Sequence, residues 1–100
     1  MILVYTTCGN RKEAEKVAGI LLKKRLAACI NYFPVSAIYT WKGKKCRENE
    51  VALLLKTAEA KWNDLQKEIR KLHSYDMPCI LKLKVGANTD FDEWVRKSVA

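Results

Sequence analysis

Residues 26–41, LAACINYFPVSAIYTW, form an apolar segment that is too long for one ordinary strand. About 15 extended residues reach about 50 Å. Pro34 cannot donate a ladder hydrogen bond, so we expect a bulge, a bend or a sheet edge there. A polar turn region around Gly43 and an apolar return strand at 51–57 complete a long antiparallel hairpin. Beyond Pro34 one face of the hairpin carries Val35, Ala37, Tyr39 and Trp41.

The rest of the sequence predicts two further strands and three helices. Apolar residues at 1–7 and alternating residues at 79–85 predict strands. Apolar positions three and four apart predict helices over about 11–25 and 58–72, and a short helix follows near the C-terminus. We therefore expect one α+β domain over 1–100. Its order is typical of a ferredoxin-like βαββαβ antiparallel sheet, with an extra C-terminal helix and a long hairpin.

Polar residues mark the expected helix ends. Asn10 followed by Glu13 is typical of an N-cap with its capping-box partner. Thr57 is the expected N-cap of the second helix, and Asp90 that of the third. His73 follows the basic last turn of the second helix, where a cation interacts favourably with the helix dipole.

The apolar content is high for so short a chain. Hydrophobic residues make up 49% of the sequence, yet a domain of this size buries only about two-thirds of its surface. We expect some of them to be buried against another copy, because large exposed apolar patches mark interaction sites. An overhanging hairpin also has unpaired backbone edges that favour pairing with a neighbour. The candidate groove or interface residues are Tyr32, Tyr39, Trp41, Tyr75 and Trp94. A ligand platform is the alternative for the hairpin aromatics.

The charge pattern indicates which classes of binding partner are expected. The net charge is +8, but the charges are spread along the expected helices and favour a solvated surface over a nucleic-acid site. The aromatic pattern of RNA-recognition modules is absent. No apolar run approaches the roughly 18–20 residues of a membrane span, and MILVYTTC has no basic signal-peptide start. We expect a cytoplasmic protein that does not bind membranes, with nucleic acid as the less favoured partner.

KLHSYDMPCI, residues 71–80, holds the single histidine of the chain. His73, Asp76, Cys79 and Cys8 could converge on copper, zinc or a similar ion if the strand ends meet near this loop. The structural alternative is a capping histidine with buried thiols. No cysteine lies in a C-x-x-C pair, and we expect free thiols, with Cys29 and Cys79 as small core residues.

Catalysis and phosphate binding have weaker support. Nothing selects one thiol to pair with His73, so no nucleophilic enzyme is expected. The TCGN stretch at residues 7–10 has one glycine before a helix and lacks a phosphate-loop pattern, which favours an ordinary strand–helix turn.

Six blocks in order carry a resemblance to a known family. They are VYTT at 4–7, KRLAACIN at 24–31, YTWKGK at 39–44, E…LLLKT at 50–57, LHSYDMP at 72–78 and FDEW at 91–94. Together they resemble the CutA family, the divalent-cation tolerance proteins, along nearly the whole chain. The resemblance implies a ferredoxin-like homotrimer with a role in tolerance to copper and other divalent metals. It implies no catalytic reaction, and its PII-like architecture suggests a sensor or regulator.

Two departures from the family pattern concern the metal. His-Pro-Tyr is usual where this chain has His73, Ser74 and Tyr75. The resemblance also implies a strand thiol and a second histidine as copper ligands, but Thr6 and Leu72 stand there. The expected function is a non-catalytic, homotrimeric CutA-like protein. It would bind copper or another divalent cation through His73 and Cys8 at an inter-subunit groove. The alternatives are a PII-like sensor of a small anionic ligand and a nucleic-acid-binding domain.

Overall fold

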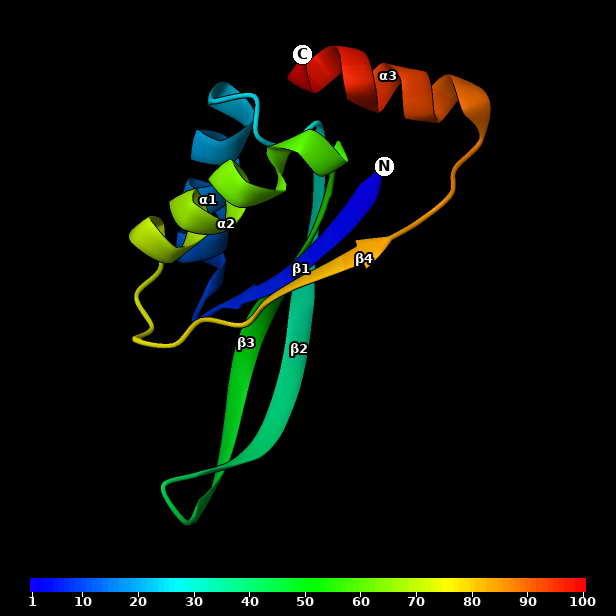
Figure 1. Ribbon diagram of the computed structural model, residues 1–100. Helices are drawn as coiled ribbons and strands as arrows, with labels where there is room; N and C mark the ends of the chain where they lie inside the picture. The colour runs from blue at the N-terminus through cyan, green and yellow to red at the C-terminus, as the bar shows by residue number, and fades with distance from the viewer.

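The computed structural model describes residues 1–100 as a four-stranded antiparallel sheet with its helices (Figure 1). The sheet order is β2-β3-β1-β4, which confirms the ferredoxin-like expectation. Helices α1 and α2 cover one face, and the β2–β3 hairpin projects beyond them, giving extents of 45 × 24 × 21 Å. The elements are β1 Ile2–Cys8, α1 Arg11–Lys23, β2 Cys29–Trp41, β3 Lys44–Thr57, the 3₁₀ turn η1 Glu59–Lys61, α2 Trp62–Leu72, β4 Ile80–Lys84 and α3 Thr89–Val99.

The hairpin is longer and tighter than the sequence predicted. Strand β3 begins at Lys44, directly opposite Trp41, so the polar stretch expected to be a turn region is mostly strand. The turn itself is Lys42 and Gly43, with φ angles of 51° and 76°, the left-handed pair that suits the twist of a two-residue hairpin. Polar residues do not end the strand because the overhanging hairpin lies in water. Pairing continues through Pro34 without a bulge, and β2 is an edge strand.

Two predicted N-caps are wrong. Thr57 is the last residue of β3, opposite Ile2, and its buried hydroxyl has no hydrogen-bond partner. The chain then enters α2 through η1, so the conformation of Thr57 is determined by strand pairing and not by helix capping. Asp90 lies inside α3, where its carboxylate accepts from the backbone N–H of Phe91.

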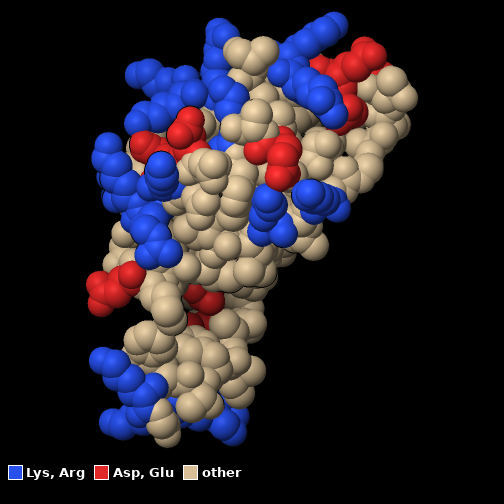
Figure 2. Space-filling view, viewed as in Figure 1, with Lys and Arg blue, Asp and Glu red and all other residues tan.

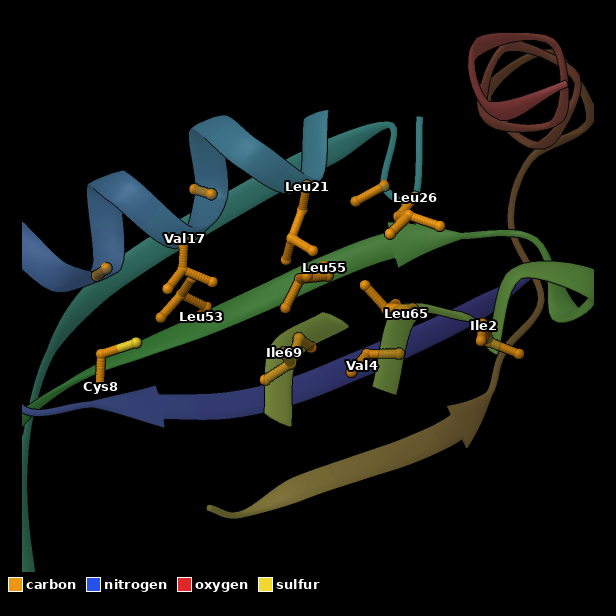
Figure 3. Close-up of a cluster of buried hydrophobic side chains, with 13 residues drawn as sticks. Ile2, Val4, Cys8, Val17, Leu21, Leu26, Leu53, Leu55, Leu65 and Ile69 are labelled. Atoms are coloured by element: carbon orange, nitrogen blue, oxygen red, sulfur yellow. The ribbon is translucent and has the colours of Figure 1, made fainter. Parts of the chain in front are cut away.

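The core fills the space between the sheet and helices α1 and α2 (Figure 3). Side chains alternate along a strand, so every second residue of β1 and β3 faces the helices. Burying one leucine or isoleucine contributes about 1.5–3 kcal/mol. Cys8 stands at the end of this core, nearest the loop after α2. The core residues drawn with labels are Ile2, Val4, Cys8, Val17, Leu21, Leu26, Leu53, Leu55, Leu65 and Ile69.

The sheet face opposite α1 and α2, here called the open face, is also apolar. The strand register places Leu83 opposite Leu3 and Leu81 opposite Tyr5, alternating with the core residues. Leu81 is 51% exposed and Leu83 48% exposed. The same register puts Tyr39 and Trp41 on this face, as the alternation beyond Pro34 predicted. No helix of the chain covers the open face (Figure 1).

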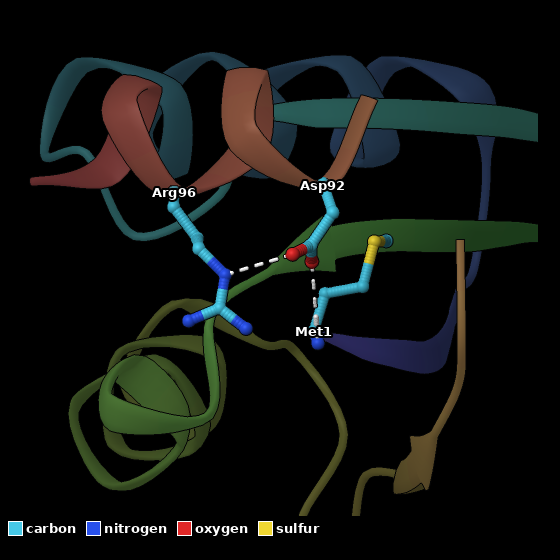
Figure 4. A network of polar contacts seen from close by, with 3 residues as sticks. All are labelled: Met1, Asp92 and Arg96. Atoms are coloured by element: carbon cyan, nitrogen blue, oxygen red, sulfur yellow. Dashed lines mark hydrogen bonds and ion pairs between the residues drawn. The ribbon is translucent and has the colours of Figure 1, made fainter. Parts of the chain in front are cut away.

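Helix α3 is fixed to the start of β1 through a polar contact (Figure 4). One Asp92 carboxylate oxygen lies 3.6 Å from the Met1 ammonium, and the other accepts from Arg96 Nε at 2.9 Å. The hydrogen bond from Arg96 lowers the pKa of Asp92. The predicted interface residue Trp94 lies on α3 and stacks with Phe91 at 5.6 Å. The longest α-helix, α1, has 13 residues, and none could span a bilayer.

Candidate metal site and groove

His73 caps the end of α2 and turns its ring toward β1. Its backbone N–H donates to Ile69 O at 2.9 Å, and its φ and ψ of −76° and 142° end the helix. Ring Nδ1 accepts from the Tyr75 N–H at 3.0 Å, and Nε2 faces Thr7 O at 2.5 Å. With Nδ1 accepting, Nε2 is placed to donate its hydrogen to the Thr7 carbonyl oxygen.

The His73 ring meets two side chains from distant parts of the chain. The donor atoms of Cys8, Glu13 and His73 all lie within 4.8 Å of one another. Cys8 ends β1, Glu13 lies in the first turn of α1 and His73 follows α2. Thiol, carboxylate and imidazole are donors that suit zinc and copper. We call these three residues the donor cluster.

Hydrogen bonds hold Glu13 in this position. Its Oε1 accepts from the Gly9 N–H at 2.9 Å, and its Oε2 accepts from the Ser74 N–H at 3.2 Å. The predicted N-cap is confirmed, because Asn10 Oδ1 accepts from the Glu13 N–H at 2.8 Å. The glutamate side chain, however, reaches Gly9 rather than the N–H of Asn10. It thereby bridges the start of α1 and the loop after α2.

The electrostatics define the protonation states in the donor cluster. Burial raises the pKa of the Cys8 thiol to about 12, with a further contribution from the charges of Glu13 and Glu50. Partial burial favours the neutral form of Glu13, but hydrogen bonds from Ser74 and Gly9 outweigh it and keep its pKa below the usual value. At neutral pH Cys8 is thus a thiol and Glu13 a carboxylate, beside the imidazole of His73. The donor set fits a divalent metal once the thiol proton is released, as metal capture by cysteine requires.

A groove of about 610 Å³ lies between the loop and the hairpin. The loop supplies residues 74–77 and Cys79, and the hairpin supplies aromatic and acidic side chains. Figure 2 shows acidic atoms in the hollow beside the hairpin, whereas most of the charged atoms elsewhere in this view belong to Lys and Arg. The carboxylates of the groove are Glu48, Glu50 and Asp76, and its aromatic residues are Tyr39, Trp41 and Tyr75.

Tyr75 connects the groove to the donor cluster. Its ring lies 4.6 Å from the His73 ring, and its hydroxyl donates to Glu50 Oε2 at 2.8 Å. Burial, and then this hydrogen bond, raise the pKa of Tyr75. A hydrogen bond to Glu48 likewise raises the pKa of Tyr39.

The structure separates the predicted site residues into three groups. It brings His73 and Cys8 together in the donor cluster, and it places Tyr75, Tyr39 and Trp41 in the groove. Tyr32 lies elsewhere, on the helix side of β2 with Arg11 5.9 Å above its ring, and Trp94 is on α3.

Three expectations about the remaining candidates change. Asp76 lines the groove and is not in the donor cluster. Cys79 is exposed and Cys29 half-buried, so the prediction of two core thiols is wrong. Cys79 directly precedes β4, an edge strand of the sheet, and lines the groove. Glu13 was missed as a donor, because its capping role accounted for it and nothing local points to His73.

A small antiparallel α+β domain of this topology is a ferredoxin-like protein, and here a thiol, a carboxylate and an imidazole gather at the ends of its strands and helices. Residues 2–98 match the family model described as CutA1 divalent ion tolerance protein. The chain therefore belongs to the CutA1 family, as its resemblance implied.

Individual relatives agree with this assignment. The divalent-cation tolerance protein CutA of Thermotoga maritima is 44% identical over 100 residues, covering 99% of each chain. The crystal structure of CutA1 from Pyrococcus horikoshii OT3 with mutation D60A has a TM-score of 0.96 at 43% identity, covering 98% of this chain and 97% of that one. The PII-like protein CutA from Nostoc sp. PCC 7120 has a TM-score of 0.94 at 28% identity, covering 100% and 98%.

Proposed function

We propose that this CutA1-family protein is a homotrimeric, non-catalytic protein that binds copper or another divalent cation at the donor cluster. The observation that carries the proposal is the meeting of Cys8, Glu13 and His73 within 4.8 Å. Two of them are nitrogen and sulfur donors, which copper and zinc prefer over the oxygen-only sites of magnesium and calcium. The family description names divalent ion tolerance and no reaction.

The residues that line the groove favour a positively charged ligand. Three carboxylates, Glu48, Glu50 and Asp76, line it in a protein whose net charge is +8. Such a surface concentrates cations beside the donor cluster and repels anions. This lining argues against the small anionic ligand expected for a PII-like sensor.

Metal titration tests the proposal directly. Zinc(II), which is redox-inert, is titrated by calorimetry into the fully reduced wild type and into His73→Ala and Glu13→Gln. We expect saturable binding in the wild type and at least a tenfold weaker affinity in both variants. Glu93→Gln removes an exposed carboxylate on α3 and serves as the control, with unchanged affinity expected. Equal heats in the wild type and His73→Ala would refute the site.

The trimer is supported by the uncovered open face. Apolar residues such as Leu81 and Leu83 are about half exposed there, and the edge strand β2 has free backbone groups along its length. In a trimer the open faces cover one another, and the groove, which shares Tyr39 and Trp41 with this face, adjoins a neighbouring copy. Light scattering at micromolar concentration tests this, and a monomer would refute it.

We infer a cytoplasmic location from the thiols. All four cysteines are free, and free thiols are typical of proteins in reducing compartments. Full recovery of unmodified thiols from protein purified under alkylating conditions supports this inference, and a disulfide-linked form would contradict it.

A PII-like regulator is the second candidate function. It rests on the structural match to the PII-like protein CutA from Nostoc sp. PCC 7120 and on the groove. A small ligand in the groove would contact Trp41, so its fluorescence should change on binding. A cationic ligand that changes this fluorescence in the absence of metal would favour the regulator over the metal-binding role alone.

A further inference from the structure

The loop of residues 74–79 joins α2 to β4 and is held by few polar contacts. None of the backbone–backbone hydrogen bonds outside the helices and strands involves these residues. Three hydrogen bonds hold the loop instead: Ser74 N–H to Glu13 at 3.2 Å, Tyr75 N–H to His73 Nδ1 at 3.0 Å, and Tyr75 hydroxyl to Glu50 at 2.8 Å. Two of the three acceptors are members of the donor cluster.

The bond between Tyr75 and His73 cannot coexist with a metal on the His73 ring. A ring nitrogen of a neutral imidazole has one lone pair or one hydrogen. A metal on Nδ1 takes the lone pair that now accepts from the Tyr75 N–H. A metal on Nε2 replaces the hydrogen there, so the ring hydrogen moves to Nδ1. That hydrogen then points at the Tyr75 N–H, and two N–H donors that face each other cannot form a hydrogen bond. Either mode of coordination breaks the same hydrogen bond.

We propose that the 74–79 loop is a latch, in which the backbone N–H of Tyr75 competes with the metal for His73, so that metal capture releases the loop and remodels the groove. The proposal rests on the metal-binding function proposed above. The released segment is the groove wall itself, since residues 74–77 and Cys79 line it. The metal state of the buried cluster is thereby transmitted to an accessible surface.

The coupling must also act in reverse. If metal binding opens the loop, any contact that holds the loop closed weakens the metal affinity by the same factor. The Tyr75 hydroxyl on Glu50 is such a contact, because it anchors the loop to β3 without touching the donor cluster. Removing the anchor should therefore strengthen zinc binding.

Nuclear magnetic resonance tests the latch without any assay of activity. The ¹⁵N shifts of the His73 ring report its tautomer, and hydrogen exchange reports the protection of the Tyr75 amide, each with and without saturating zinc(II). We expect the metal-free ring to be protonated on Nε2. Zinc should shift the ring resonances and increase the exchange rate of the Tyr75 amide at least tenfold.

The outcomes separate the latch from the underlying function. An unperturbed His73 ring under saturating zinc would refute the metal site and, with it, the latch. A perturbed ring with unchanged protection of the Tyr75 amide would overturn the latch and leave the metal site intact. Exchange at the amide of Val17, within α1, provides the reference for a rigid position.

A pair of matched variants tests the reverse coupling. Tyr75→Phe removes the anchor hydroxyl, whereas Tyr39→Phe removes a hydroxyl from the same groove that does not hold the loop. Tyr75→Phe should bind zinc about fivefold more tightly than the wild type, the effect of one hydrogen bond, and Tyr39→Phe should match the wild type. Equal affinities in the two variants would overturn the proposal.

A second matched pair probes the contact of the loop with Glu13. Ser74→Pro removes the N–H that donates to Glu13, whereas Ser74→Ala retains it. The extended backbone of His73, with ψ of 142°, already suits a following proline. Faster exchange of the Tyr75 amide in Ser74→Pro than in Ser74→Ala, before zinc is added, is expected. Equal exchange in the two would contradict a role for this contact in the latch.

Discussion

The hydroxyl of Tyr75 donates to Glu50 Oε2 at 2.8 Å and so joins the loop after α2 to the middle of the long hairpin. The two residues are 25 positions apart in the chain. A hydrogen bond to a charged, partly buried acceptor stabilises a fold by about 1.5–3 kcal/mol. This contact is the one polar link between the loop and β3, and its energy can be measured.

A double-mutant cycle with Tyr75→Phe, Glu50→Gln and the double variant should give a coupling free energy of about 1 kcal/mol or more. The measurement is the free energy of unfolding from denaturant titration of metal-free protein. Additive effects of the two single changes would show that the hydrogen bond contributes nothing to stability.

The ion pair between Lys24 and Glu68 should make the stability of the protein depend on pH in the acid range. Lys24 Nζ lies 2.6 Å from Glu68 Oε1, and this hydrogen bond lowers the pKa of Glu68 below its ordinary 4.5. A lowered carboxyl pKa gives stability that is present above the unfolded-state pKa and is lost as the pH falls below it. Glu68→Gln should therefore be less stable than wild type at pH 7, with the difference shrinking below about pH 4.5. A difference that stays constant between pH 7 and pH 3 in thermal unfolding would contradict this.

Trp41→Ala should lower the thermal stability of the assembled protein. Trp41 is 45% exposed on the open face of the single chain, and aromatic residues commonly anchor interfaces at 2 kcal/mol or more. The melting temperature should fall by about 4 °C or more. A trimer of unchanged melting temperature would show that Trp41 lies outside the subunit contacts.

A charge on the open face should dissociate the subunits. Leu83→Glu places an unpaired carboxylate on the sheet face that we propose is buried between copies, where an unpaired charge is costly. Leu22→Glu is the matched control, because Leu22 is 44% exposed but lies on α1, away from this face. Light scattering should show monomers for Leu83→Glu and trimers for Leu22→Glu. Trimers in both cases would place the interface elsewhere.

The hairpin turn should respond to residue type at its two positions. Lys42 has a φ of 51°, a left-handed conformation that asparagine adopts more readily than lysine. Lys42→Asn should raise the free energy of unfolding by about 0.5 kcal/mol or more, and Gly43→Ala should lower it by about 1 kcal/mol or more. Denaturant titration measures both. A less stable Lys42→Asn variant or a more stable Gly43→Ala variant would mean that the turn adopts another type.

Much of the fold could be predicted because its signals are local. The alternation beyond Pro34 predicted the two faces of the hairpin, and the spacing from Asn10 to Glu13 predicted the start of α1. Local signals gave a wrong prediction where a residue suits one local structure but tertiary pairing places it in another. Thr57 is typical of a cap, but the ladder with Ile2 extends through it. The polar residues after Gly43 are typical of a turn, but a strand exposed on both faces tolerates them.

The candidate site depended on long-range geometry. Composition and spacing singled out His73 and Cys8, and the family resemblance implied copper binding and a trimer. Only the tertiary structure placed Glu13 beside His73, 60 residues away, and exposed Cys79 at the sheet edge. Secondary structure follows from short-range sterics and periodicity, which are present in the sequence. The position of one loop against another helix depends on how the whole chain packs, and the contacts of the His73 ring follow from that packing.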